Sequence, residues 1–280
     1  MMNKRLFSIL AASTLLLFGL AACGSNDSGE TTTTSAKKEN KVIKVASHLP
    51  PMTDVVELAG DVLEKDGWQV ELIQVSDNIQ YNELVNHKEA DASFAQHEPY
   101  MQMYNKEKHG NLTAVQKIYN AKVGYYSKQF KSIDELPEGA KIAIPNDLPN
   151  EGRALAILNE AGLIKLKDGV GFEGTVKDIE ENPKQFELVP LDLLNLPEAY
   201  NEDDIAMTYN YPTYIAKVGL TPKDAILLEK TIDERFAISL VAREDNEASE
   251  AIQALKQAMT SETVKKFLED NHSDTLVPAF

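Results

Sequence analysis

The beginning of the fold is set by the segment Lys41-Val42-Ile43-Lys44-Val45-Ala46-Ser47, which runs into His48-Leu49-Pro50-Pro51. Alternating apolar side chains that end at a pair of prolines are typical of a β-strand followed by a loop. Thr53-Asp54 can then cap a helix that reaches Glu64 along one apolar face. The elements expected next are a strand over 68–75, a short helix over 83–87 and a strand over 90–95. This β-α-β-α-β order predicts a parallel sheet covered by helices.

A second series of the same kind starts at Lys141-Ile142-Ala143-Ile144-Pro145 and continues into a helix over 150–161. The remaining expected elements are strands over 123–127, 186–189, 204–208 and 235–243, and helices over 193–200 and 248–268. Residues 162–181 are rich in Gly, Lys and Asp and are predicted to be irregular. Two β/α series joined by a late returning segment predict an α/β fold of two lobes, of the type II-like periplasmic-binding-protein kind, with a cleft between them. Lobe 1 would comprise 42–131 and 232–280, and lobe 2 would comprise 132–231.

The N-terminal residues predict an exported lipoprotein. Lys4-Arg5 precede an apolar run from Leu6 to Leu20, which is too short to be a good membrane span and is typical of a signal peptide. The run ends at Leu20-Ala21-Ala22-Cys23, a lipoprotein cleavage motif. We therefore expect residues 1–22 to be removed, Cys23 to carry lipid such as palmitate, and the protein to be held on the extracytoplasmic face of the cell membrane. Residues 23–41 are polar and predict a flexible tether.

Composition excludes several classes of function. The formal net charge of −16 argues against binding to nucleic acid. Cys23 is the only cysteine, so disulfides and thiolate metal sites are excluded. No nucleophile elbow, P-loop, dinucleotide-binding or H-E-x-x-H motif is present, and the sequence therefore predicts neither an enzyme nor a cofactor. His48 and His97 follow strands, as in a zinc receptor, but no tetrahedral ligand set can be assembled around them, so no metal site is expected.

Polar and aromatic side chains follow the predicted strands, at the edge where open α/β sheets bind ligands. Arg153, near a helix start, is either a surface arginine or the partner of a ligand carboxylate, which Asn146 and Asn150 could share. His97 and Tyr100 are either loop residues or the wall of a small-molecule pocket. Tyr209-Asn210-Tyr211 are either core residues or the opposite wall. These residues by themselves do not identify the ligand.

The same stretches resemble the methionine-binding lipoproteins of ABC importers, the NlpA family, over essentially all of Val42 to Phe280. The segments that carry the resemblance are Ala90-Asp91-Ala92, Gln96-His97-Glu98-Pro99-Tyr100, Lys131 to Pro137, Ile142 to Asp147 with Asn150 to Leu155, Ala161 to Gly169, and Val277-Pro278-Ala279-Phe280. The resemblance implies two α/β lobes that close on an amino acid. It also implies that the partners are an ABC permease with its ATPase, and we expect a monomer.

The resemblance assigns binding roles residue by residue. The carboxylate-binding arginine of the family falls on Arg153, and its ligand-contacting histidine and tyrosine fall on His97 and Tyr100. Other pocket positions of the family have changed. Phe94-Ala95 stands in place of Tyr-Phe, Asn78 in place of a tyrosine, and Tyr209-Asn210-Tyr211 in place of the Asn-Gly-Asn that holds the amino group. We therefore keep, beside methionine or a related amino acid, a different amino acid, a short peptide, and an adhesin or signalling role as alternatives.

Overall fold

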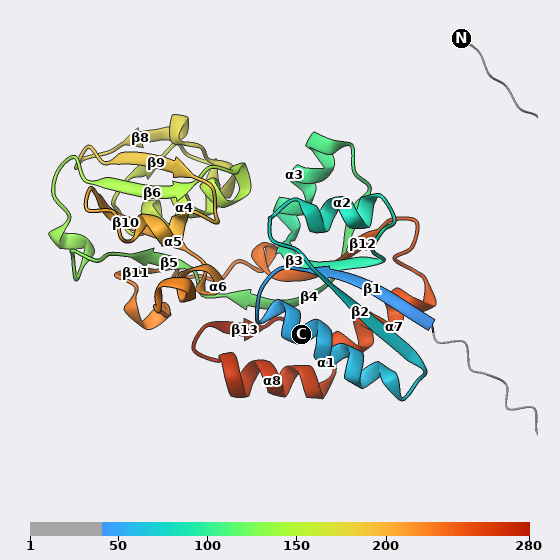
Figure 1. The fold of residues 1–280 in the computed structure, drawn as a ribbon. Helices are drawn as coiled ribbons and strands as arrows, with labels where there is room; N and C mark the ends of the chain where they lie inside the picture. The colour runs from blue at the N-terminus through green and yellow to red at the C-terminus, as the bar shows by residue number, and fades with distance from the viewer. Residues whose placement is uncertain (1–40) are drawn as a thin grey trace, which may run out of the picture. The chain divides into compact units, whose positions relative to one another are not determined.

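A computed structural model describes residues 41–280, which build two large β-sheets covered by helices and one small sheet (Figure 1). The first sheet has the strand order β13-β4-β12-β3-β1-β2. Its strands are β1 (Lys41–Ser47), β2 (Trp68–Gln74), β3 (Ala92–His97), β4 (Leu112–Ala121), β12 (Ile238–Arg243) and β13 (Leu276–Pro278). The strand β1 lies between β2 and β3 and is parallel to both, whereas β12 is antiparallel to β3 and β4.

Helices cover both faces of the first sheet. They are α1 (Met52–Glu64), α2 (Gln80–Asn86), α3 (Glu98–Lys108), α7 (Glu250–Met259) and α8 (Glu262–His272). Figure 1 shows α2 and α3 on one face and α1, α7 and α8 on the other. The helix α1 buries Val55, Val56, Ala59 and Leu63 at helical spacing. Burial of such an apolar face supplies most of the stability of a helix of this length.

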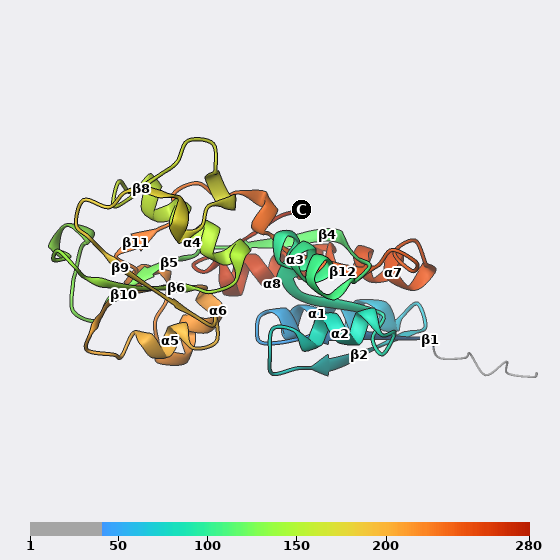
Figure 2. The ribbon, with the colours of Figure 1, turned by 90° about the horizontal axis from the view of Figure 1, so that it is seen from above.

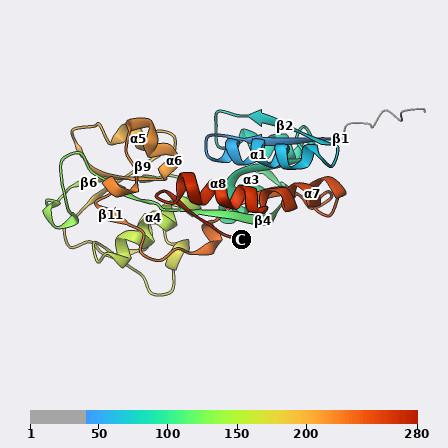
Figure 3. The same ribbon diagram turned by 90° about the horizontal axis from the view of Figure 1, so that it is seen from below.

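The second sheet has the order β11-β5-β10-β6-β9. Its strands are β5 (Gly124–Tyr126), β6 (Lys141–Pro145), β9 (Glu187–Leu191), β10 (Ile205–Asn210) and β11 (Leu227–Leu228), and its helices are α4 (Leu148–Glu160), α5 (Leu196–Ala199) and α6 (Pro212–Ile215). The helix α4 lies on one face and α5 and α6 on the other (Figures 2 and 3). A small sheet of β7 (Lys165–Leu166) and β8 (Ile179–Glu181) stands in the segment predicted to be irregular.

The boundary between the lobes lies earlier than predicted. The strand β5 pairs with β10 and β11, so residues 124–131 follow the second sheet and not lobe 1. The chain therefore passes from the first sheet to the second at 122–123, directly after β4. The sequence misled us because only Lys122 and Val123 separate β4 from β5, with no Gly-Pro turn to mark the passage.

Two helices also differ from the prediction. The helix expected over 248–268 is divided into α7 and α8, because the Ser261 hydroxyl accepts a hydrogen bond from the Val264 N–H and so begins a new helix. The segment Gln96 to Tyr100, expected to be a loop, contains the end of β3 and the start of α3. His97 is the N-cap of α3, and Pro99 lies in its first turn.

The predicted signal peptide 1–22 and the lipid-bearing Cys23 lie outside the described residues, as does the predicted tether except for Lys41, which begins β1. Within residues 41–280, none of the helices combines the length and the apolar character that a membrane span requires.

Candidate functional site

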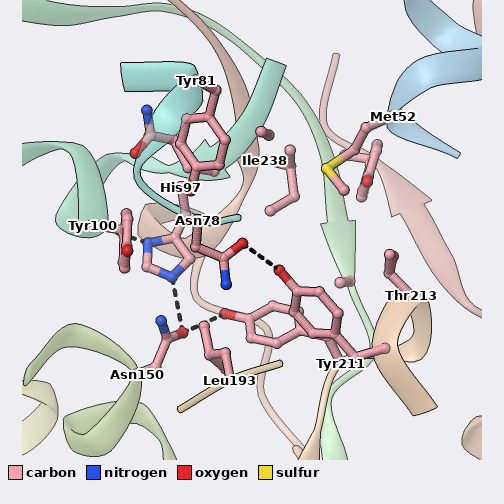
Figure 4. A pocket seen from close by; sticks show the side chains of 15 residues that line it. Met52, Asn78, Tyr81, His97, Tyr100, Asn150, Leu193, Tyr211, Thr213 and Ile238 are labelled. Carbon is pink, nitrogen blue, oxygen red and sulfur yellow. Dashed lines mark hydrogen bonds between the residues drawn. The ribbon is translucent and has the colours of Figure 1, made fainter. Parts of the chain in front are cut away.

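A pocket opens where strands of both sheets end, and it holds about 470 Å³ of empty space including its mouth. Both lobes contribute to its wall, and most of the wall is aromatic or apolar (Figure 4). The residues that line it are Met52, Asn78, Tyr81, Ala95, Gln96, His97, Tyr100, Tyr119, Ala121, Asn150, Leu193, Tyr211, Thr213, Tyr214 and Ile238. None of these side chains is Asp, Glu, Lys or Arg. The wall therefore combines five phenol rings with neutral hydrogen-bonding groups, as small-molecule sites commonly do.

Asn150 stands at the centre of the polar part of this wall. The Asp147 side chain caps α4 by accepting from the Asn150 N–H at 3.1 Å and from its Nδ2 at 2.8 Å. These two bonds fix the orientation of the amide, so Asn150 Oδ1 faces the pocket. That oxygen accepts a hydrogen bond from the Tyr211 hydroxyl at 2.8 Å and lies 3.0 Å from His97 Nε2.

The hydrogen bonds around His97 determine which ring nitrogen carries the proton. His97 Nδ1 accepts from the Tyr100 N–H at 3.2 Å, because it caps α3. Nε2 therefore carries the hydrogen and donates to Asn150 Oδ1. Burial and, to a smaller extent, the positive charge of Arg153 lower the pKa of His97 to about 3, although the hydrogen bond with Asn150 opposes them. His97 is a neutral donor at physiological pH.

Two hydrogen bonds between pocket residues join the lobes. The first is the bond from His97, at the end of β3, to Asn150 in α4. The second runs from the Tyr214 hydroxyl in α6 to Asn78 Oδ1, which follows β2, at 3.0 Å. Figure 4 shows both bonds on the pocket wall. All four groups are neutral, so separating the lobes would expose no buried charge at these positions.

Arg153 lies behind this wall and does not line the pocket. Its Nε donates to Glu229 Oε1 at 2.8 Å and its Nη2 to Glu229 Oε2 at 2.6 Å. Both side chains are almost completely buried, with 1 % and 3 % exposure. This two-point pairing is the strongest geometry for an arginine and a carboxylate. The guanidinium expected to meet a ligand carboxylate is therefore already paired within the protein.

The remaining contacts of Arg153 lead toward the pocket. Its Nη1 donates to the Tyr211 hydroxyl at 3.1 Å, and that hydroxyl in turn donates to Asn150 Oδ1. The ring of Phe236, in the returning segment, lies 4.5 Å from the guanidinium carbon and 5.1 Å from the His97 ring. Tyr211 thus stands between the arginine and the pocket, in contact with both.

The structure brings some of the predicted site residues together and separates others. Asn78, His97, Tyr100, Asn150 and Tyr211 line the pocket. Phe94, Tyr209, Asn210 and Arg153 do not line it and are buried behind it. Phe94 packs edge-on against Tyr119, and Tyr209 packs in the same way against Tyr125.

Sequence reasoning missed several residues of the wall. The missed aromatic residues are Tyr81, Tyr119 and Tyr214, and the missed apolar residues include Met52 and Leu193. They stand in α1, α2, β4 and α6 or near α5, where an isolated apolar side chain looks like a core residue. Four of them follow the carboxyl end of a strand with a parallel neighbour, which is their only available signal: Met52, Tyr81, Leu193 and Tyr214. Tyr119 lies within the antiparallel strand β4 and lacks even that signal. Among residues 41–280 there is no group of three or more His, Cys, Asp or Glu side chains able to hold a metal ion.

A two-lobed α/β fold with a neutral, largely aromatic pocket between its lobes is the arrangement of a solute-binding protein. Residues 43–280 match the NlpA lipoprotein family, and the chain belongs to that family.

Named relatives agree with this membership. The chain is 38% identical to the D-methionine-binding lipoprotein MetQ of Salmonella typhimurium, over 88% of this chain and 87% of the relative. A crystal structure of a YaeC-family lipoprotein from Enterococcus faecalis is 50% identical, with a TM-score of 0.77 over 86% of this chain and all of the other. A nutrient binding protein from Burkholderia cenocepacia, solved bound to methionine, is 34% identical, with a TM-score of 0.80 over 85% of this chain and all of the other.

Proposed function

We propose that this protein captures methionine or a related amino acid outside the cell for an ABC importer. The observation that carries the proposal is the pocket built from both lobes, with two hydrogen bonds across it. Opening the lobes admits the solute, and closing them buries it against the tyrosines. The name of the Salmonella relative and the methionine-bound Burkholderia structure support the choice of solute.

The rest of the proposal concerns how the protein is held and what it contacts. Lipid on Cys23 keeps the body at the extracytoplasmic face of the membrane, with residues 1–22 removed. A single copy delivers its solute to a membrane permease whose ATPase drives uptake. Within this function the protein makes and breaks no bond of the solute, and the residues in contact with the solute are Asn78, His97, Tyr100, Asn150 and Tyr211.

The proposal is tested by thermal unfolding of the purified protein with a panel of amino acids and short peptides. A ligand at 100 times its Kd stabilises the native state by about 2.7 kcal/mol, which raises the Tm of a chain of this size by about 5 °C. Mass spectrometry of any compound that leaves the natively purified protein on denaturation identifies the resident solute. If no member of the panel shifts the Tm and no compound is released, the protein is not a receptor for these solutes.

A matched pair of variants locates the binding. Thr213→Trp places a large side chain in the pocket wall from a half-buried position, whereas Thr231→Trp makes the same change at an exposed position outside this pocket. We expect the first variant to lose the ligand-dependent rise in Tm and the second to keep it. Loss in both, or in neither, would place the binding elsewhere.

A further inference from the structure

Two hydrogen-bond donors of the pocket wall point at a single oxygen atom, Asn150 Oδ1. His97 Nε2 lies 3.0 Å from this oxygen, and the Tyr211 hydroxyl donates to it at 2.8 Å (Figure 4). The histidine belongs to lobe 1 and the tyrosine to lobe 2, so the donors meet across the cleft. An ionised carboxylate is a stronger acceptor than an amide oxygen. A solute carboxylate that enters the pocket can therefore compete for the Tyr211 hydroxyl.

Arg153 reinforces this hydroxyl from behind the wall. Its Nη1 donates to the Tyr211 oxygen at 3.1 Å, while Glu229 accepts from its Nε and Nη2. A hydroxyl that accepts a hydrogen bond from a cation becomes a stronger donor, because successive hydrogen bonds polarise one another. Burial raises the pKa of Tyr211, and the charge and hydrogen bond of Arg153 oppose that rise. The influence of the buried cation thus reaches the pocket through the Tyr211 hydroxyl.

The part of the wall near Tyr100 has the opposite polarity. Besides burial, the carboxylates of Asp147, Asp192 and Asp77 raise the pKa of Tyr100, and no cation opposes them there. Asp147 also acts on Tyr211, but its effect is smaller than that of Arg153. The wall is therefore positive at Tyr211 and negative at Tyr100, a pattern that complements the carboxylate and the ammonium of a free amino acid.

We propose that the Tyr211 hydroxyl binds the carboxylate of the solute, and that Arg153 is a positioning residue that holds and polarises this hydroxyl. On binding, the hydroxyl hydrogen turns from Asn150 Oδ1 to a carboxylate oxygen, and the tyrosine stays neutral. Asn150 keeps its other partners, His97 and Asp147, so the exchange leaves no polar group of the amide unpaired. This inference rests on the proposed function and specifies how the amino acid is oriented, with its ammonium toward Tyr100.

The test compares L-methionine with L-methioninol, in which a hydroxymethyl group replaces the carboxylate, by isothermal titration calorimetry at neutral pH. We expect the wild-type protein to bind methionine at least about tenfold more tightly. Tyr211→Phe keeps the ring and removes the hydroxyl, and it should weaken methionine binding by about 10- to 100-fold. Methioninol loses only a neutral hydrogen bond in this variant, so its binding should weaken by about two- to fivefold.

Two other hydroxyl deletions serve as controls. Tyr126→Phe removes a buried hydroxyl that has no hydrogen-bond partner and lies outside the pocket, and it should leave both affinities unchanged. Tyr214→Phe removes a hydroxyl of the pocket wall whose partner is Asn78 in the other lobe. It should weaken both compounds by the same factor, because it affects the contact between the lobes and not the carboxylate.

A combined variant tests the positioning role of Arg153. Arg153→Gln together with Glu229→Gln removes the cation without leaving a buried charge unpaired. This pair of substitutions should weaken methionine more than methioninol. Added to Tyr211→Phe, it should weaken methionine little further, because the guanidinium acts through a hydroxyl that is already gone. Losses that simply add would overturn this role.

The remaining outcomes separate the inference from the proposed function. Methionine binding that Tyr211→Phe leaves unchanged or tightens would mean that the carboxylate is bound by another group, and it overturns the inference. An equal loss for both compounds in Tyr211→Phe also overturns it, because the hydroxyl would then have a structural role only. Wild-type protein that binds methioninol as tightly as methionine, or binds neither, overturns it too. The proposed function fails as well only if the wider panel gives no shift in Tm and no compound is released.

Discussion

Arg153→Gln removes one half of a buried ion pair and leaves the Glu229 carboxylate, 3 % exposed, without its partner. Breaking such a pair from one side costs about 3–5 kcal/mol. The substitution also removes the cation from the face of Phe236 and the donor from the Tyr211 hydroxyl. For a fold of this size, about 2 °C of Tm is lost per kcal/mol, so we expect a fall of about 6–10 °C.

The double variant decides whether that cost comes from the unpaired charge. Glu229→Gln by itself should cost a similar amount, since it leaves the Arg153 guanidinium buried and unpaired. Arg153→Gln combined with Glu229→Gln should cost clearly less than the sum of the two, because replacing both partners leaves no isolated charge. Urea unfolding followed by circular dichroism measures all four proteins. Single variants that each lose less than about 1 kcal/mol, or losses that simply add, would refute the pairing on which this reasoning depends.

Further predictions concern pH, packing and lipid. The pKa of His97 is about 3 in the folded protein and 6.5 ordinarily, so between these pH values the unfolded chain binds one more proton than the folded protein. The free energy of unfolding therefore falls by about 1.4 kcal/mol for each unit by which the pH is lowered. Asp147, whose pKa burial raises to about 6, acts in the opposite sense. Urea unfolding of wild type and His97→Gln over this pH range should therefore show that the variant lacks the histidine contribution to the pH dependence, whatever the two proteins differ by at neutral pH. Gly152→Ala should destabilise the protein, although alanine is more favourable than glycine within a helix by about 1 kcal/mol. The Cβ of the new alanine would lie 2.0 Å from the Phe172 carbonyl oxygen. An unchanged urea midpoint would contradict this prediction. Cys23→Ala should leave the protein unlabelled by palmitate and absent from the detergent phase, and continued labelling would remove Cys23 as the anchor.

The fold was predictable because its signals are local. Apolar alternation marks β1, a continuous apolar run marks β6, and an apolar face marks α1. Asp147 caps α4, but the cap predicted for α1 at Thr53-Asp54 is wrong, because the helix begins at Met52 and no side chain caps it. The sequence also indicates the helix α3, with Glu98-Pro99 in its first turn and lysines in its last. We predicted a binding loop at its start instead. The division of α7 from α8 depends on a single serine, whose capping role competes with an otherwise continuous helical pattern.

The site was less predictable because its contacts join distant residues. The partner of Arg153 is 76 residues away along the chain, and no spacing rule points from one to the other. Likewise, the bond between Asn78 and Tyr214 spans 136 residues. The resemblance to a family identified Arg153 as the position for a carboxylate, and the structure does show a carboxylate there. That carboxylate belongs to Glu229, a residue of this chain.

The segment Tyr209-Asn210-Tyr211 shows why a resemblance can be correct for the backbone and insufficient for the ligand. Residues two apart in a strand point to the same face, and the rings of Tyr209 and Tyr211 lie 5.9 Å apart, but only Tyr211 lines the pocket. Tyr209, within β10, is fully buried against Tyr125, while Tyr211, just past the strand, lines the pocket. The hydroxyl of Tyr211 then links Arg153 to Asn150, and through Asn150 to His97 in the other lobe. A change at this one position therefore alters both the charge that a ligand meets and the hydrogen bonds that join the lobes, and ligand choice and lobe closure are expected to change together in Tyr211 variants.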